Sequence, residues 1–170
     1  VIKEQGIGDE IIYSSIYPDL LKKYPQTIIE TEPRLLSIFR RSFKNKKNFV
    51  PYSFFSKNKK SLNEFDIVMY AGSLGKLFRN KLQDFSPTNY LFAENEKILK
   101  IKKDIDKLKP KIKIGIAWRS KASLGSEKSL DLNMLKPILL LKKYCFINMQ
   151  YDDSKIEIKK FNKKNKIKIH

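Results

Sequence analysis

A glycine-rich turn near the start of the chain holds the residues best suited to chemistry. Gly6 and Gly8 lead directly into two carboxylates, Asp9 and Glu10, and then into a helix-patterned apolar stretch. Glycine lets the backbone approach a ligand closely. A carboxylate at the mouth of a helix can either cap that helix or remove a proton from a hydroxyl group. Asp9 is therefore a candidate general base, with an N-cap as the alternative, and Glu10 is its less favoured substitute.

A second polar stretch follows an alternating apolar segment farther along the chain. Residues 112–118 have the alternation of a strand, and a polar loop follows them. Cationic and hydroxyl side chains in such a loop, together with helix-start amides, can bind an anionic group. A solvated lysine and a serine cap are the alternative, and a tryptophan at a strand end is more often core than contact. The candidate residues are Trp118, Arg119, Ser120, Lys128 and Ser129.

Two further candidates lie at the ends of predicted strands. Ser73 belongs to the loop at 72–75, after the strand predicted at 65–70, and Gln150 closes the strand predicted at 145–150. In open α/β sheets, ligands bind outside the carboxyl ends of the strands. Both residues are therefore predicted to border a ligand, with a plain turn or strand end as the alternative.

The apolar period along the chain alternates between 3.6 and two, which indicates an α/β fold. Helices are predicted at 9–23, 33–41, 95–108, 132–141 and 155–162, the first of them interrupted at Tyr17 by Pro18. The remaining predicted strands are at 27–31, 48–52, 112–118 and the last four residues. Pro110, between two lysines after a charged helix, marks the predicted boundary between domains 1–109 and 110–170.

In this order, the segments resemble the heptosyltransferase-like glycosyltransferases, in particular the bacterial enzymes that carry tetratricopeptide repeats ahead of the catalytic part. The resemblance rests on the turn at 6–9 and on segments 118–120, 128–130 and 146–150. It implies the GT-B architecture, with a Rossmann-like acceptor domain at 1–109 and the first part of a Rossmann-like donor domain at 110–170. The nucleotide-gripping end of that donor domain does not follow His170. We therefore expect a truncated enzyme, and whether the fragment is active alone stays open.

The resemblance also implies a reaction, which is sugar transfer from a nucleotide-sugar donor to a saccharide, lipid-linked glycan or peptide acceptor, with no metal and no further cofactor. It makes Asp9 the base and places Gly6, Gly8, Glu10 and Ser73 on the acceptor side. It assigns the donor and its phosphates to Trp118, Arg119, Ser120, Lys128, Ser129 and Gln150. The basic pair usual before the serine is reduced here to Lys128 alone, because Glu127 precedes it.

The chain is strongly basic, with 36 Lys+Arg against 18 Asp+Glu and a net charge of +18. Such a charge favours phosphate-bearing partners, anionic membrane surfaces or nucleic acid. Lysine is spread through every surface segment, however, and the densest run at 155–168 has no aromatic residue except Phe161. Nucleic acid is therefore the less favoured partner, because base stacking needs aromatic side chains. The alternative function is a non-catalytic basic α/β module that binds a polyanion.

Cysteine and histidine are too scarce for several kinds of site. A lone Cys145 excludes an internal disulfide and fits a reducing compartment, and a lone His170 leaves no basis for a zinc or Cys–His site. No apolar stretch reaches the roughly 18–20 residues that span a bilayer. We expect a cytoplasmic protein, with peripheral contact to the inner membrane and homo-oligomerisation as open options.

Overall fold

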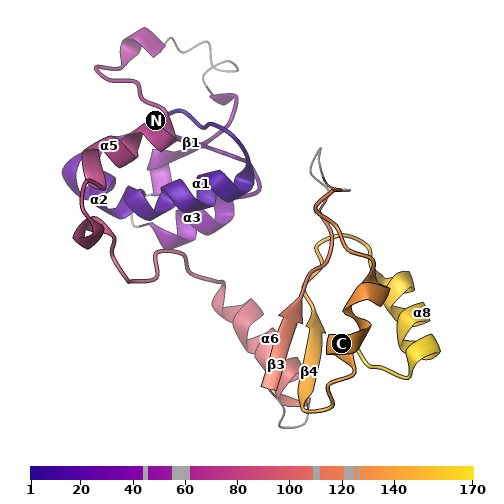
Figure 1. The fold of residues 1–170 in the computed structure, drawn as a ribbon. Coiled ribbons are helices and arrows are strands. Elements are labelled where there is room, and N and C mark those ends of the chain that lie inside the picture. Colours follow the sequence, from indigo (N-terminus) through magenta and orange to yellow (C-terminus); the bar gives the residue numbers. More distant parts are fainter. Residues whose placement is uncertain (44–45, 55–61, 109–111, 121–124, 126) are drawn as a thin grey trace. The chain divides into compact units, whose positions relative to one another are not determined.

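The computed structural model describes residues 1–43, 46–54, 62–108, 112–120, 125 and 127–170 (Figure 1). The chain divides into an amino-terminal unit, Val1–Ile98, and a carboxy-terminal unit, Leu99–His170. Both units combine helices with a small parallel sheet, which confirms the α/β class. The boundary predicted at Pro110 lies outside the described residues and stays a prediction.

The sheet of the amino-terminal unit is built around β1 (Ile29–Thr31) and β2 (Phe49–Pro51), which pair in parallel. Both strands were expected from their β-branched and aromatic runs. The start of the chain extends the sheet beyond β1, because the Glu30 N–H donates to the Val1 carbonyl at 3.0 Å. On its other side, Ile2 forms a parallel bridge with Tyr70. Across this sheet the neighbours are therefore β2, β1, the start of the chain at Val1 and Ile2, and Tyr70. In chain order these are the third, second, first and fourth segments.

The strand predicted at 65–70 is wrong, since only its last residue, Tyr70, forms a bridge in the described structure. The run is apolar enough for a buried strand, but the Ile67 side chain is 75% exposed. Strand propensity depends on packing against neighbours, and this run lacks the burial that its composition suggested.

The helix predicted at 9–23 is divided, as Pro18 led us to expect. It forms α1 (Ile7–Tyr13), a 3-10 turn (Ser14–Ile16) and α2 (Tyr17–Lys23). Proline has no N–H to donate and fits only the first turn of a helix, so a new helix starts immediately before Pro18. The next helix, α3 (Leu36–Ser42), begins later than predicted, because residues 33–35 form a turn.

An aromatic cluster forms the centre of the amino-terminal core. Tyr17, Phe39 and Phe49 are fully buried, and Phe43 lies against them. Neighbouring ring centroids are 5.2–6.1 Å apart, mostly edge-to-face or tilted. Such pairs stabilise a core beyond the area they bury. The cluster joins α2 and α3 to β2 and so fixes the helices that flank the sheet. The unit also contains the 3-10 helix Ala71–Leu74 and α5 (Gly75–Phe78).

The carboxy-terminal unit has a parallel sheet of β3 (Ile112–Ile116) and β4 (Tyr144–Asn148), at the places the sequence predicted. Ile169 bridges the far side of β4, also in parallel. Between and after the strands lie a 3-10 helix (Leu132–Leu135), α7 (Lys136–Leu139) and α8 (Lys155–Asn165). The core contains Trp118, Leu132, Leu139, Phe146, Ile158, Phe161 and Ile169.

The helix predicted at 95–108 is present as α6 (Asn95–Asp106), but the core face that its apolar spacing indicates is exposed over part of its length. The apolar side chains at helical spacing include Ile98 and Ile101, and both are exposed. Periodicity predicts an amphipathic helix but does not say what covers its apolar side. Among the described helices, none is long and apolar enough to cross a bilayer.

Candidate functional site

The strand order of the amino-terminal unit creates a topological switch point. From the first segment, the chain runs through α1 to β1 and β2 on one side, and it returns at Tyr70 on the other side. The loops that follow Ile2 and Tyr70 therefore leave the same edge of the sheet in neighbouring positions. In open parallel sheets this is the place where ligands bind. It contains the predicted turn at 6–9 and the predicted loop at 72–75, which the fold brings to one edge.

The two loops are in direct contact. The Gly72 N–H donates to the Glu4 carboxylate at 3.0 Å, and α1 packs against the 3-10 helix that contains Gly72 and Ser73. A Cβ on Gly72 would lie 3.2 Å from the Tyr13 hydroxyl, so any larger residue at this position would press on the Tyr13 side chain. Neither Glu4 nor Tyr13 was a sequence candidate, because their contacts with Gly72 join segments more than fifty residues apart.

The backbone before the turn has an uncommon conformation. Gln5 has a φ of 58°, in the left-handed region that residues other than glycine rarely occupy. Its carbonyl accepts a hydrogen bond from the Lys3 ammonium at 2.9 Å. Backbone outliers of this kind cluster at functional sites. Gly6 and Gly8, which follow, are exposed and leave the turn open to solvent.

Asp9 occupies the first turn of α1 and is half-buried. Its Oδ2 accepts the Gly6 N–H at 3.2 Å, so the carboxylate caps the helix from the third position. Among the described residues, this is the hydrogen bond that its side chain makes. The N-cap position proposed for Asp9 is therefore wrong, because Gly6 occupies it, although the Asp9 carboxylate does cap the helix from within its first turn. A role as base stays a prediction.

Glu10, the alternative base, is turned into the protein. Its side chain is 1% exposed, and its two oxygens accept the Glu32 N–H at 2.9 and 3.3 Å. Burial raises the pKa of this carboxyl group, although the hydrogen bond from Glu32 opposes the shift. Glu10 thus connects α1 to the chain that leaves β1, which is a structural task.

Gln150 joins the ends of β3 and β4. It is 8% exposed, and its Oε1 accepts the backbone N–H groups of Trp118 and Arg119 at 3.0 and 3.2 Å. Its Nε2 donates to the Arg119 carbonyl at 2.9 Å. The structure places Gln150 between two strand ends, and its predicted contact with a ligand stays a prediction. Trp118, which it holds, is buried in the core.

The charge of Arg119 is already neutralised within the carboxy-terminal unit. Its guanidinium pairs with Asp152 at 2.7 Å and with Glu157 at 2.6 Å, and these hydrogen bonds raise its pKa. It also lies over the Trp118 ring, 5.6 Å from the centroid. Asp152 and Glu157 were not sequence candidates, because they follow Arg119 by more than thirty residues. A guanidinium with two carboxylate partners is a poor phosphate ligand.

The remaining candidates are on the loop before the 3-10 helix Leu132–Leu135. The Ser120 N–H donates to Ser129 Oγ at 3.0 Å, and Ser129 Oγ donates to the Gly125 carbonyl. The Lys128 side chain is exposed, and the backbone N–H of Lys128 donates to the Gly125 carbonyl at 3.2 Å. Residues 121–124 and 126 of this loop lie outside the described residues. Phosphate binding by Lys128 and Ser129 stays a prediction.

Comparison with known proteins finds a distant relative. Protein FlbA of Caulobacter vibrioides is 24% identical over 179 residues, which cover 93% of this chain but 29% of FlbA. The chain therefore spans less than a third of the length of that relative. No protein-family model matches the chain, and no solved structure matches it. The assignment to the heptosyltransferase-like glycosyltransferases is therefore wrong, because these comparisons return a distant similarity to FlbA in its place.

Proposed function

We propose that the chain is part of an enzyme that transfers a sugar from a nucleotide-sugar donor to an acceptor hydroxyl group. The observation that carries the proposal is the switch point of the amino-terminal unit, where the turn at 6–9 and the loop at 72–75 leave one edge of a parallel sheet. We further propose that both units are Rossmann-like. Two observations support a Rossmann-like fold. The segments of the first sheet lie in the order 3-2-1-4, and in the second sheet β4 lies between β3 and Ile169.

Asp9 is the proposed general base of the reaction. An acceptor hydroxyl bound at the turn would lose its proton to the Asp9 carboxylate as its oxygen attacks the anomeric carbon of the donor sugar. The bond from that carbon to the diphosphate would break in the same step, and the diphosphate would leave with the electron pair. Gly6 and Gly8 supply an exposed backbone that a ligand can approach closely. Ser73, half-buried beside the turn, is a further acceptor contact.

Lys128 is the proposed cation for the leaving diphosphate. Arg119 is paired with two carboxylates, so the exposed Lys128 is the better candidate of the two. Ser129 holds the loop by its contacts with Ser120 and Gly125 and would keep Lys128 in position. Each proposal concerns one unit and can be tested by itself.

The test of Asp9 compares reaction rates with stability. Nucleoside diphosphate release is measured for a panel of nucleotide sugars with glycan and peptide acceptors, using the wild-type chain and Asp9→Asn. We expect the rate to fall by a factor of about 10²–10⁴, which is the usual contribution of a general base. The Asn oxygen can still accept the Gly6 N–H, so the melting temperature should change little.

A matched control is Asp84→Asn. Asp84 makes the same kind of capping contact, because its Oδ2 accepts the Lys81 N–H at 2.8 Å at the start of another short helix. The Asp84→Asn variant should lose about as much stability as Asp9→Asn and should release nucleoside diphosphate at the wild-type rate. Equal rates for wild type and Asp9→Asn would refute the base, and absence of turnover with every donor would refute the transfer reaction.

A second candidate, polyanion binding, is favoured by α8. This helix exposes five lysines, at 155, 159, 160, 163 and 164, and Glu157, its single acidic residue, is engaged with Arg119. A DNA duplex is the test ligand, titrated at 50 and 200 mM salt. Binding through these lysines should weaken steeply as salt rises, whereas a nucleotide bound at Lys128 should resist salt far better. DNA binding that does not depend on salt would exclude binding through the lysines of α8.

A further inference from the structure

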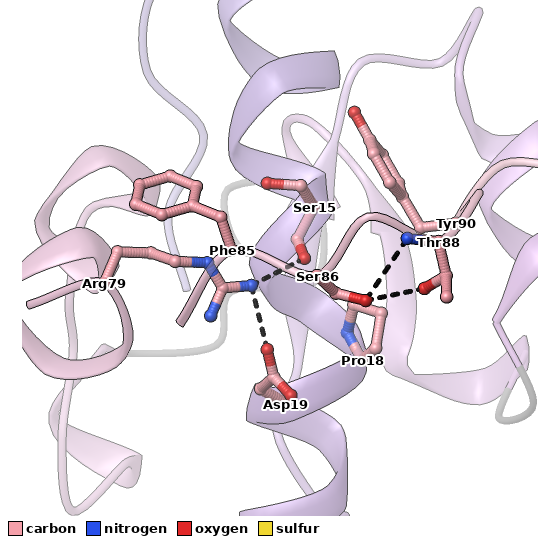
Figure 2. Close-up of a pocket in the computed structure, with 8 residues that line it drawn as sticks. All are labelled: Ser15, Pro18, Asp19, Arg79, Phe85, Ser86, Thr88 and Tyr90. Atoms are coloured by element: carbon pink, nitrogen blue, oxygen red, sulfur yellow. Dashed lines mark hydrogen bonds and ion pairs between the residues drawn. The ribbon is translucent and has the colours of Figure 1, made fainter. Parts of the chain in front are cut away.

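A small pocket lies in the amino-terminal unit, at the opposite end of α1 from Asp9. Its volume is about 120 Å³. Asp9 belongs to the first turn of α1, whereas the pocket begins at Ser15, beyond the carboxyl end of that helix. Six residues at about 1.5 Å of rise place the two some 9 Å apart along the helix axis. The pocket is therefore separate from the switch point. Its lining residues are Ser15, Pro18, Asp19, Arg79, Phe85, Ser86, Thr88 and Tyr90 (Figure 2).

Arg79 is the central polar group of the pocket. Its side chain is 6% exposed, which is unusual for a charged residue. One terminal nitrogen donates to the Ser15 carbonyl at 2.9 Å and to Asp19 Oδ2 at 2.8 Å, and the other donates to the Phe78 carbonyl at 2.8 Å. Figure 2 shows the guanidinium directed at Ser15 and Asp19. Within the described residues, its Nε–H has no hydrogen-bond acceptor.

A buried N–H without a partner costs free energy that a ligand can recover. The guanidinium lies over the Phe85 ring, 5.7 Å from the centroid, and this ring is more than half exposed. In the complex proposed below, Phe85 would have to turn aside for a ligand oxygen to reach the Nε–H. The guanidinium and the Phe85 ring both line the pocket.

The facing wall carries hydroxyl groups and a second ring. Ser86 Oγ and Thr88 Oγ1 are 2.7 Å apart, and the Thr88 N–H donates to Ser86 Oγ at 3.3 Å. The Tyr90 hydroxyl donates to the Ile11 carbonyl at 3.0 Å, so the ring is anchored to α1. The pocket thus combines hydrogen-bond donors, acceptors and two aromatic rings.

The charges indicate the class of ligand. Asp19 is 48% exposed beside Arg79, so an anion attracted to the guanidinium would also meet the carboxylate. A neutral ligand with several hydroxyl groups meets no such repulsion, because each hydroxyl group can donate to Asp19 and accept from Arg79. Its C–H faces would pack on Phe85 and Tyr90. The volume is well below the roughly 300–1,000 Å³ of pockets for drug-sized ligands, so it suits one ring.

We propose that this pocket binds a single neutral sugar ring. The proposal concerns binding alone and does not depend on the transfer reaction proposed for the switch point. Free glucose, galactose, mannose and N-acetylglucosamine are the probes, added to the full chain without any nucleotide. Inorganic phosphate and acetate are the anion probes.

The readout is the nuclear magnetic resonance signal of the Arg79 Nε–H together with the melting temperature. At least one of the four sugars should shift that signal in a saturable manner at millimolar concentration. Asp19→Asn and Thr88→Val should each weaken binding about tenfold, which corresponds to a loss of about 1.4 kcal/mol. Asp106→Asn, an exposed aspartate of α6, is the control and should bind as wild type does. Asp9→Asn should also bind normally, which separates this site from the proposed base.

Three results would overturn the proposal. Saturable binding of phosphate or acetate without any sugar would make the pocket an anion site. Sugar binding that survives both Asp19→Asn and Thr88→Val would place the sugar elsewhere. No shift of the Arg79 signal with any of the four sugars at 50 mM would mean that the pocket does not bind them. Thr88 is exposed, so its variant remains informative if changes nearer Arg79 disturb folding.

Discussion

Replacing Gln150 by methionine should destabilise the carboxy-terminal unit selectively. The Gln150 side chain makes three hydrogen bonds, two from the N–H groups of Trp118 and Arg119 and one to the Arg119 carbonyl. Methionine has similar length and fills the same space but makes none of them. At about 0.5–1.5 kcal/mol for each bond, the loss is about 3 kcal/mol, and it is increased because the buried Trp118 N–H and the half-buried Arg119 N–H are left without acceptors.

Trp118 provides the assay, because it is the single tryptophan of the chain and belongs to the carboxy-terminal core. Its fluorescence reports the urea unfolding of that unit and does not report the unfolding of the amino-terminal unit. With a slope of roughly 1–3 kcal/mol per molar urea, the midpoint should fall by about 1–3 M. Lys142→Met, at an exposed lysine of the same unit, is the control and should leave the midpoint unchanged. A shift below about 0.3 M for Gln150→Met would show that the three bonds contribute little, and the clamp described for Gln150 would be refuted.

Two further predictions concern the amino-terminal unit. Burial raises the pKa of Glu10, so ionisation of this carboxyl group opposes folding. The free energy of unfolding therefore falls as pH rises through the raised pKa. Urea midpoints of Glu10→Gln and wild type should therefore be similar below about pH 4 and diverge in favour of the variant at pH 8; a constant difference across this range would contradict the buried-carboxyl account. Gly72→Ala should cost about 1–3 kcal/mol, because its Cβ would lie 3.2 Å from Tyr13, whereas Gly75→Ala has open space in α5 and should stabilise by about 0.4–1 kcal/mol. Circular dichroism melts compare this pair, and equal effects of the two alanines would show that the contact with Tyr13 is not tight.

The parts of the fold that the sequence predicted are those with local causes. β-branched and aromatic runs located β1, β2, β3 and β4, and Pro18 located the break between α1 and α2. The failures concern burial. The run at 65–70 and the apolar side of α6 have the right composition and period, but their exposure depends on which distant segments cover them. No local pattern contains that information.

The same division applies to the candidate site. The turn at 6–9 was identified from glycines and carboxylates ahead of a predicted helix, and the loop at 72–75 from its place after a predicted strand; the strand order brings the two together. The partners that decide the chemistry were not predicted. Asp152 and Glu157, which neutralise Arg119, and Asp19, which pairs with Arg79, are each distant in sequence from the arginine they contact.

The polar candidate residues of the two units serve different purposes. In the carboxy-terminal unit, Gln150 and Arg119 direct their hydrogen bonds to the protein itself, so a ligand would have to displace contacts that already stabilise the fold. In the amino-terminal unit, Asp9 makes a single described contact at an exposed turn, and Arg79 retains an N–H without an acceptor. A ligand gains more free energy from groups that it satisfies than from groups whose existing partners it must replace. The amino-terminal unit is therefore the place to look for binding first, and in the other unit Lys128 is the candidate cation whose engagement would leave the Arg119 pairs intact.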